Sequence, residues 1–203
     1  RKICDDNGIL MITDEVQSGW ARSGRMFASE YFAEAGCAPD IMTTAKSIAG
    51  GLPLSAVTAS AEIMDAVTPG TIGGTYCGNP VSCASALKVA EVMEREDYPA
   101  KARAIAEKLN KTFNEWKEKY EVIGDVRGMG CMMGVEFVQD KKSKAPAADL
   151  VAKIIDAAVQ KGLIMEAAGT YNNVIRFLCP LCATDAQIDA GLEIYEAAIK
   201  ECL

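Results

Sequence analysis

The sequence contains no histidine. This absence excludes serine–histidine–acid hydrolysis, histidine general bases and histidine-rich metal sites. Any acid–base chemistry must therefore come from lysine, aspartate, glutamate, tyrosine or cysteine side chains.

Long apolar runs and basic runs are also missing. No apolar run approaches the ~20 residues needed to cross a bilayer, and no secretory signal is found. The 21 basic and 28 acidic residues give a net charge of −7, without a basic stripe for a phosphate backbone. These features argue against membrane and nucleic-acid partners and favour a cytoplasmic location. The chain starts at Arg1 rather than Met, which leaves open a preceding targeting segment.

The eight cysteines are scattered through apolar and helical stretches, as expected for reduced, buried thiols in the cytoplasm. The one local pattern is Cys179-Pro180-Leu181-Cys182. A zinc site needs a second such pair or histidines at ligand spacing, and neither is present. We therefore expect packing roles for Cys179 and Cys182, and no metal.

Two short apolar runs each lead to a chemically reactive residue. Ile9–Ile12 precedes Asp14, and Ile41-Met42 precedes Lys46. Both runs are typical of buried strands, and the carboxyl ends of parallel strands meet at one ligand-binding edge. A lysine among apolar neighbours favours the neutral amine that forms a Schiff base. The alternatives are a solvated lysine and an aspartate that only caps a turn.

Two further segments have both a ligand-binding and a structural interpretation. In Gly73-Gly74-Thr75, the glycines allow backbone to approach a phosphate and the Thr75 hydroxyl adds a donor, although the tripeptide is also common in ordinary loops. Arg176 lies within the apolar strand 174–178 and requires a carboxylate partner. That partner is either a substrate carboxylate or an acid of the protein itself.

The alternation of strand and helix patterns predicts an α/β fold. A composition shift near residues 94–100 predicts a boundary between residues 1–96 and a smaller α+β domain over 97–203. The expected helices cover 29–35, 80–96, 99–120, 147–161 and a last helix capped by Thr184; the other expected strands cover 55–60, a pair within 122–138, and 174–178.

Four segments resemble the class III (omega) aminotransferases, which are pyridoxal-phosphate enzymes of fold type I. The matching segments are Asp14–Gly19, Ala45–Leu54, Gly73–Pro80 and Asn173–Leu181. The resemblance implies that residues 1–96 are the later part of the cofactor-binding large domain and that 97–203 form the small C-terminal domain. It also implies transamination between an omega-amino acid, with 4-aminobutyrate as the expected donor, and 2-oxoglutarate.

The same resemblance assigns a role to each candidate site residue. Lys46 forms the Schiff base with pyridoxal 5'-phosphate and shuttles the proton, and Asp14 holds the pyridine nitrogen. The remaining assignments are a ring-face contact for Val16, a ring-oxygen contact for Gln17, phosphate contacts for Gly74 and Thr75 across a dimer interface, and a substrate carboxylate for Arg176.

Family members are about twice this length, and the part preceding the Asp14 strand is missing from this sequence. We expect that part to carry a phosphate loop, an aromatic ring-stacking residue and a gate glutamate. The isolated chain is therefore expected to be inactive, and the protein to be a homodimer or larger. The alternative hypotheses for its function are an ornithine or acetylornithine aminotransferase, a related decarboxylase or aminomutase, and an inactive α/β fragment that self-associates through an exposed sheet edge.

Overall fold

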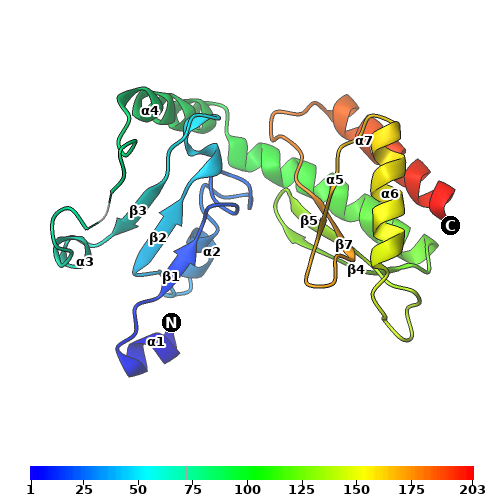
Figure 1. Ribbon diagram of the computed structural model, residues 1–203, viewed down its shortest axis with the longest axis horizontal. Coiled ribbons are helices and arrows are strands. Elements are labelled where there is room, and N and C mark those ends of the chain that lie inside the picture. Colours follow the sequence, from blue (N-terminus) through cyan, green and yellow to red (C-terminus); the bar gives the residue numbers. More distant parts are fainter. Residues whose placement is uncertain (72) are drawn as a thin grey trace. The chain divides into compact units, whose positions relative to one another are not determined.

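A computed structural model describes residues 1–71 and 73–203 (Figure 1). Ile72, within the predicted glycine-rich passage, lies outside the described residues. The chain divides into two compact units, Arg1–Ala100 and Lys101–Leu203, and each is described by itself. The boundary predicted after residue 96 lies just before helix α5 (Tyr98–Lys119).

The first unit contains a three-stranded sheet with the order β1-β2-β3. Strand β1 (Ile12–Asp14) runs parallel to β2 (Ile41–Thr44), and β3 (Ala56–Ala59) runs antiparallel to β2. In this register Asp14 lies opposite Thr43. Strands β1 and β2 therefore end at the same edge of the sheet.

In the described part of the first unit, five helical elements accompany this sheet, and the longest of them is α4. Its start matches the sequence prediction, because Asn79 Oδ1 accepts hydrogen bonds from the backbone N–H groups of Val81 and Ser82, with Pro80 in the first turn. The helices are α1 (Lys2–Asn7), α2 (Ser29–Ala33), the 3₁₀ helix η1 (Lys46–Ala49), α3 (Ala61–Asp65) and α4 (Pro80–Arg95).

The prediction that the apolar run before Asp14 is buried is wrong. Ile9 and Leu10 are exposed, and Ile12 in β1 is 60% exposed. The physical reason is that β1 is an edge strand, which pairs only with β2 among the described residues. Apolar content shows that a strand suits an interior position, but it does not supply the second layer that buries it.

The second unit is built on an antiparallel sheet with the order β4-β5-β7-β6. Strand β5 alternates between buried and half-buried residues, as expected for a sheet with one covered face. The strands are β4 (Ile123–Met129), β5 (Met132–Phe137), β6 (Glu166–Ala168) and β7 (Val174–Phe177).

Helices α5, α6 (Ala148–Gln160) and α7 (Asp185–Cys202) complete this unit, and α6 lies beside α7 (Figure 1). The predicted capping box of α7 is confirmed. Thr184 Oγ1 accepts from the Gln187 backbone N–H, while Gln187 Oε1 accepts from the Thr184 backbone N–H. No helix in the described part of the chain is both long and apolar enough to span a membrane.

An aromatic cluster joins α5, α7 and β7 in the core of the second unit. The Phe113 ring lies 5.4 Å from Trp116, 5.7 Å from Phe177 and 6.0 Å from Tyr195, measured between centroids. Trp116 and Tyr195 meet edge to face at 5.3 Å. All four side chains are buried, so this cluster binds both helices to the sheet.

Four short elements were not predicted from the sequence: α1, η1, α3 and β6. Each has six residues or fewer. Such segments are too short to display a helical or strand periodicity, and their conformation depends on neighbouring contacts.

The buried hydroxyl of Tyr195 generates a stability prediction. Its oxygen has no hydrogen-bond partner among the described residues, and burial raises the pKa of this phenol well above its ordinary value. We expect Tyr195→Phe to increase the free energy of unfolding by about 1 kcal/mol, because the substitution removes an unpaired buried polar group. Urea denaturation monitored by circular dichroism measures the change.

Tyr171, which is 67% exposed in the same unit, provides the matched control. Tyr171→Phe should leave the free energy of unfolding unchanged. A destabilised Tyr195→Phe variant would show that the hydroxyl has a stabilising partner.

Candidate active site

Asp14 lies at the carboxyl end of β1 with an exposed side chain. Its Oδ1 accepts a hydrogen bond of 2.9 Å from the Val16 backbone N–H and a weaker contact of 3.5 Å from Thr43 Oγ1. Oδ2 has no hydrogen-bond partner within the described ranges. The carboxylate is thus oriented by its own turn while one oxygen remains accessible to a ligand.

The segment after Asp14 is anchored by Glu15, which is almost completely buried. Glu15 Oε1 accepts from the Ser29 N–H at 2.6 Å, and Oε2 accepts from the Ala28 N–H at 3.1 Å and from Ser18 Oγ at 2.5 Å. This carboxylate ties the turn after β1 to the start of α2. Val16 and Gln17, both half-buried, lie in the turn it anchors.

Sequence reasoning missed this role of Glu15. An acid next to Asp14 at a strand end has the same sequence signature whether it faces solvent or the interior. Its hydrogen-bond partners at Ala28 and Ser29 are more than ten residues away in the sequence, so no pattern of neighbouring residues predicts these hydrogen bonds. The burial of Glu15 is a tertiary property.

Lys46 begins η1, two residues after the end of β2. Its φ of 49° lies in the left-handed region, which is uncommon for residues other than glycine and is concentrated at functional sites. The expectation that apolar neighbours desolvate Lys46 is wrong for the described residues, because its side chain is exposed. The backbone turn directs the side chain outward instead of packing it against α4.

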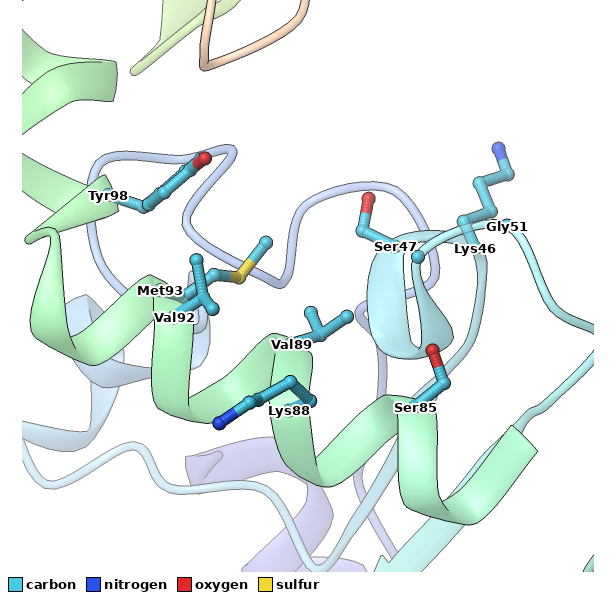
Figure 2. Close-up of a pocket in the computed structure, with 10 residues that line it drawn as sticks. Lys46, Ser47, Gly51, Ser85, Lys88, Val89, Val92, Met93 and Tyr98 are labelled. Carbon is cyan, nitrogen blue, oxygen red and sulfur yellow. The ribbon is translucent and has the colours of Figure 1, made fainter. Parts of the chain in front are cut away.

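A cavity of about 600 Å³ lies beside Lys46, between η1 and α4. Figure 2 shows the Lys46 side chain directed away from Val89 and Met93 of α4. The wall of this cavity is fixed by a hydrogen bond from Ser85 Oγ to the Ala49 carbonyl at 2.9 Å. Helix α4 therefore holds η1 in place, and with it the backbone that carries Lys46.

Gly74 and Thr75 lie in the exposed loop that precedes α4. They line a separate hollow of about 500 Å³ together with residues of the 53–55 segment and Tyr76. The structure thus places Asp14 and Lys46 after the ends of the paired strands β1 and β2, and Gly74 and Thr75 in a separate hollow of the same unit.

Arg176 lies in the middle of β7 in the second unit, opposite Glu166 of β6. Arg176 Nη2 donates to Glu166 Oε2 at 3.0 Å, and the two side chains are 27% and 71% exposed. The sequence left two possible partners for Arg176, a substrate carboxylate and an acid of the protein. Among the described residues, the partner is the protein acid Glu166. Both residues line a cavity of about 390 Å³, so a ligand carboxylate that entered it would compete with Glu166 for the guanidinium.

Comparison with known proteins identifies the family. The family model for class-III aminotransferases matches residues 1–199. The chain belongs to the class-III aminotransferase family. It is 49% identical over 201 residues to 4-aminobutyrate aminotransferase GabT of Escherichia coli, and 47% identical over 201 residues to 5-aminovalerate aminotransferase DavT of Pseudomonas aeruginosa. In both cases the match covers 99% of this chain and 46% of the relative.

Solved structures agree with this family assignment. An amine transaminase from an uncultivated Pseudomonas species, solved in its pyridoxal-phosphate-bound form, matches with a TM-score of 0.89 at 34% identity, over 100% of this chain and 47% of that chain. A transaminase from the marine bacterium Virgibacillus matches with a TM-score of 0.90 at 30% identity, over 100% and 47%. The predicted α/β transaminase fold is confirmed. The chain spans about half the length of the relatives it matches.

The buried carboxylate of Glu15 generates a second prediction. We expect Glu15→Gln to lower the free energy of unfolding of the first unit by about 2 kcal/mol, because an amide replaces a charged acceptor of three hydrogen bonds. Trp20 follows the turn that Glu15 anchors, so its fluorescence reports the loss. The measurement is made in a Trp116→Phe background, which leaves Trp20 as the only tryptophan.

Glu62→Gln is the matched control, because Glu62 is an exposed acid in the first turn of α3 in the same unit. That substitution should change the unfolding free energy by less than about 0.5 kcal/mol. Equal effects of the two substitutions would contradict the anchoring role of Glu15.

Proposed function

We propose that this chain serves pyridoxal-phosphate-dependent transamination, in which an omega-amino acid, 4-aminobutyrate first, donates its amine and 2-oxoglutarate accepts it. The observation that carries the proposal is the parallel register of β1 and β2, which brings an accessible carboxylate and an accessible lysine to one edge of the sheet. Family membership and the names of the two similar enzymes support transamination of an omega-amino acid.

The residues at this edge suit the cofactor. Asp14 presents an oriented carboxylate with one accessible oxygen, as an ion pair with a protonated pyridine nitrogen requires. Lys46 presents a primary amine on a rigid turn, as covalent attachment to an aldehyde requires. Val16 and Gln17 follow Asp14 in the anchored turn and would contact the ring face and the ring oxygen.

The chemistry that pyridoxal phosphate supplies when bound is an electron sink for the carbon that carries the amine. Asp14 would keep the ring nitrogen protonated by holding a negative charge beside it. The Lys46 amine, released once the substrate is attached, would carry a proton away from one carbon and return it to another.

Phosphate and substrate contacts are proposed for residues away from this edge. Gly74 and Thr75 offer backbone N–H groups and a hydroxyl on an exposed loop, which suits a phosphate bound across the interface of a homodimer. Arg176 would bind the substrate carboxylate after exchange with Glu166. We also propose a cytoplasmic location for the protein.

Two amino donors are represented among the similar enzymes. The two similar enzymes named above act, by their names, on 4-aminobutyrate and on 5-aminovalerate, which differ by one methylene. Glutamate formation from 2-oxoglutarate by the protein that carries this sequence, measured in parallel with 4-aminobutyrate, 5-aminovalerate and ornithine, distinguishes these donors. Release of carbon dioxide without glutamate would favour the decarboxylase alternative.

Covalent labelling tests the proposed role of Lys46. The 203-residue chain is incubated with pyridoxal phosphate, reduced with borohydride, digested and mapped by mass spectrometry. We expect the label at Lys46, and we expect Asp14→Asn to weaken labelling by about 10-fold because a charged partner of the ring is lost. The isolated chain should produce no glutamate, since its exposed lysine lacks the water-free surroundings that turnover needs.

Lys88 provides the internal control, because it lines the same cavity as Lys46 but pairs with Glu91. Lys88→Ala should leave the labelling unchanged, whereas Lys46→Ala should abolish it. Equal labelling of the two lysines would mean that Lys46 is an ordinary surface amine and would overturn the proposed role.

The contact between Glu166 and Arg176 generates a substrate-binding prediction. We expect Glu166→Gln to lower the KM for 4-aminobutyrate by about 2- to 5-fold, because it removes an intramolecular competitor for the guanidinium. Arg176→Lys should raise the KM by at least about 10-fold, because a bidentate contact is lost. Both are measured by steady-state transamination in the protein that carries this sequence.

The matched control is Glu136, which pairs with Arg127 at 2.6 Å on the same sheet. Glu136→Gln should leave the KM unchanged. An unchanged KM in Glu166→Gln would show that the Glu166 pair is purely structural and that the carboxylate binds elsewhere.

A further inference from the structure

Two cysteines distant in sequence lie in contact within the second unit. Cys131 is fully buried at the turn between β4 and β5, and Cys179 is half-buried just after β7. Their Sγ atoms are 3.3 Å apart, and Cys131 Sγ lies 4.0 Å from the Cys179 carbonyl oxygen. The sequence pattern had singled out Cys179 and Cys182, but it gave no sign of Cys131 as a neighbour.

The strand register explains this contact. Strands β5 and β7 pair antiparallel with Met133 opposite Phe177. Extending that register by two residues on each strand places Cys131 opposite Cys179. Directly opposite residues of an antiparallel pair have Cα atoms about 4.5–5.5 Å apart, which lies within the range that a disulfide spans. Residues two apart along an extended strand share a face, so this register groups Cys131 with the buried Met133 and Cys179 with the buried Phe177.

Little movement separates these thiols from a covalent bond. A disulfide joins its sulfurs at about 2.05 Å, so the 3.3 Å contact closes by rotation of the two side chains. The remaining requirement is access for an oxidant. Cys179 is half-buried and lines the same 390 Å³ cavity as Arg176, so this thiol is the one that a small molecule reaches.

We propose that Cys131 and Cys179 form a redox-modification site, a reversible disulfide produced by hydrogen peroxide. The Cys179 thiolate attacks the peroxide, the O–O bond breaks, and Cys179 sulfenic acid and one water form. The Cys131 thiolate then attacks the sulfenic sulfur, the S–S bond forms, and the hydroxyl leaves as a second water. In sum, two thiols lose two hydrogens, hydrogen peroxide becomes two waters, and a dithiol reductant reverses the reaction.

The disulfide has a structural consequence near Arg176. It closes a covalent loop between positions 48 residues apart and joins the β4–β5 turn to the end of β7, the strand that carries Arg176. A cross-link over such a loop restricts the unfolded chain and stabilises the folded one. This inference does not depend on transamination, because it uses only the thiols and the sheet register.

Cross-link mapping tests the proposal directly. The 203-residue chain is treated with one equivalent of hydrogen peroxide, alkylated in denaturant, digested and analysed by mass spectrometry without reduction. We expect a peptide pair joined through Cys131 and Cys179 that separates after dithiothreitol. A Cys179–Cys182 link, a sulfinic acid at Cys179, or unmodified thiols would each overturn the proposal.

Variants separate this pair from the exposed Cys182. Cys182→Ser should retain the Cys131–Cys179 link, whereas Cys131→Ala and Cys179→Ala should each abolish it. The Tm of the second unit is followed by Trp116 fluorescence in a Trp20→Phe background. With both cysteines intact, oxidation should raise this Tm by about 5 °C or more. The Cys179→Ala variant should show no such rise, and an equal rise there would contradict the assignment.

Discussion

The parallel pairing of β1 with β2 is the constraint on which the candidate active site depends. A parallel register makes both strands end at the same edge, so Asp14 and the residues after Thr44 emerge together. A shift of one residue would turn the Asp14 side chain to the opposite face of the sheet. Asp14 and Lys46, 32 positions apart in the sequence, thereby come to one edge of the sheet, and the proposed contacts of these two residues with the cofactor follow from that arrangement.

Two contacts away from the chemistry maintain this edge. Glu15 is buried and holds the turn after β1 against the start of α2, which orients Val16 and Gln17. Ser85 on α4 bonds to the Ala49 carbonyl and holds η1, which orients Lys46. Both act through backbone atoms, so the site residues are positioned by the main chain while their side chains remain accessible. This combination leaves Asp14 and Lys46 accessible at the edge, as the proposed cofactor contacts require.

In the second unit, the cross-strand register has the same organising role. The pairing of β6 with β7 places Glu166 opposite Arg176 and forms the ion pair that a substrate carboxylate would displace. The pairing of β5 with β7, continued past its last hydrogen-bonded residues, brings Cys131 to Cys179. Strand β7 thus carries the candidate binding residue Arg176 and leads directly to Cys179 of the candidate redox pair. The aromatic cluster around Phe113 and Tyr195 fixes this strand against α5 and α7.

Local features could be determined from the sequence by itself. The cap at Asn79, the capping box of Thr184 and Gln187, and the amphipathic patterns of the long helices depend on residues within a few positions of one another. The strand-end motifs at Asp14 and Lys46 also appear locally and led to the family. Only the tertiary structure decided that Glu15 is buried, that Lys46 and Ile12 are exposed, that Glu166 pairs with Arg176, and that Cys131 contacts Cys179. These properties depend on register and on which surfaces are covered, and such long-range pairings leave no periodic signal in the sequence.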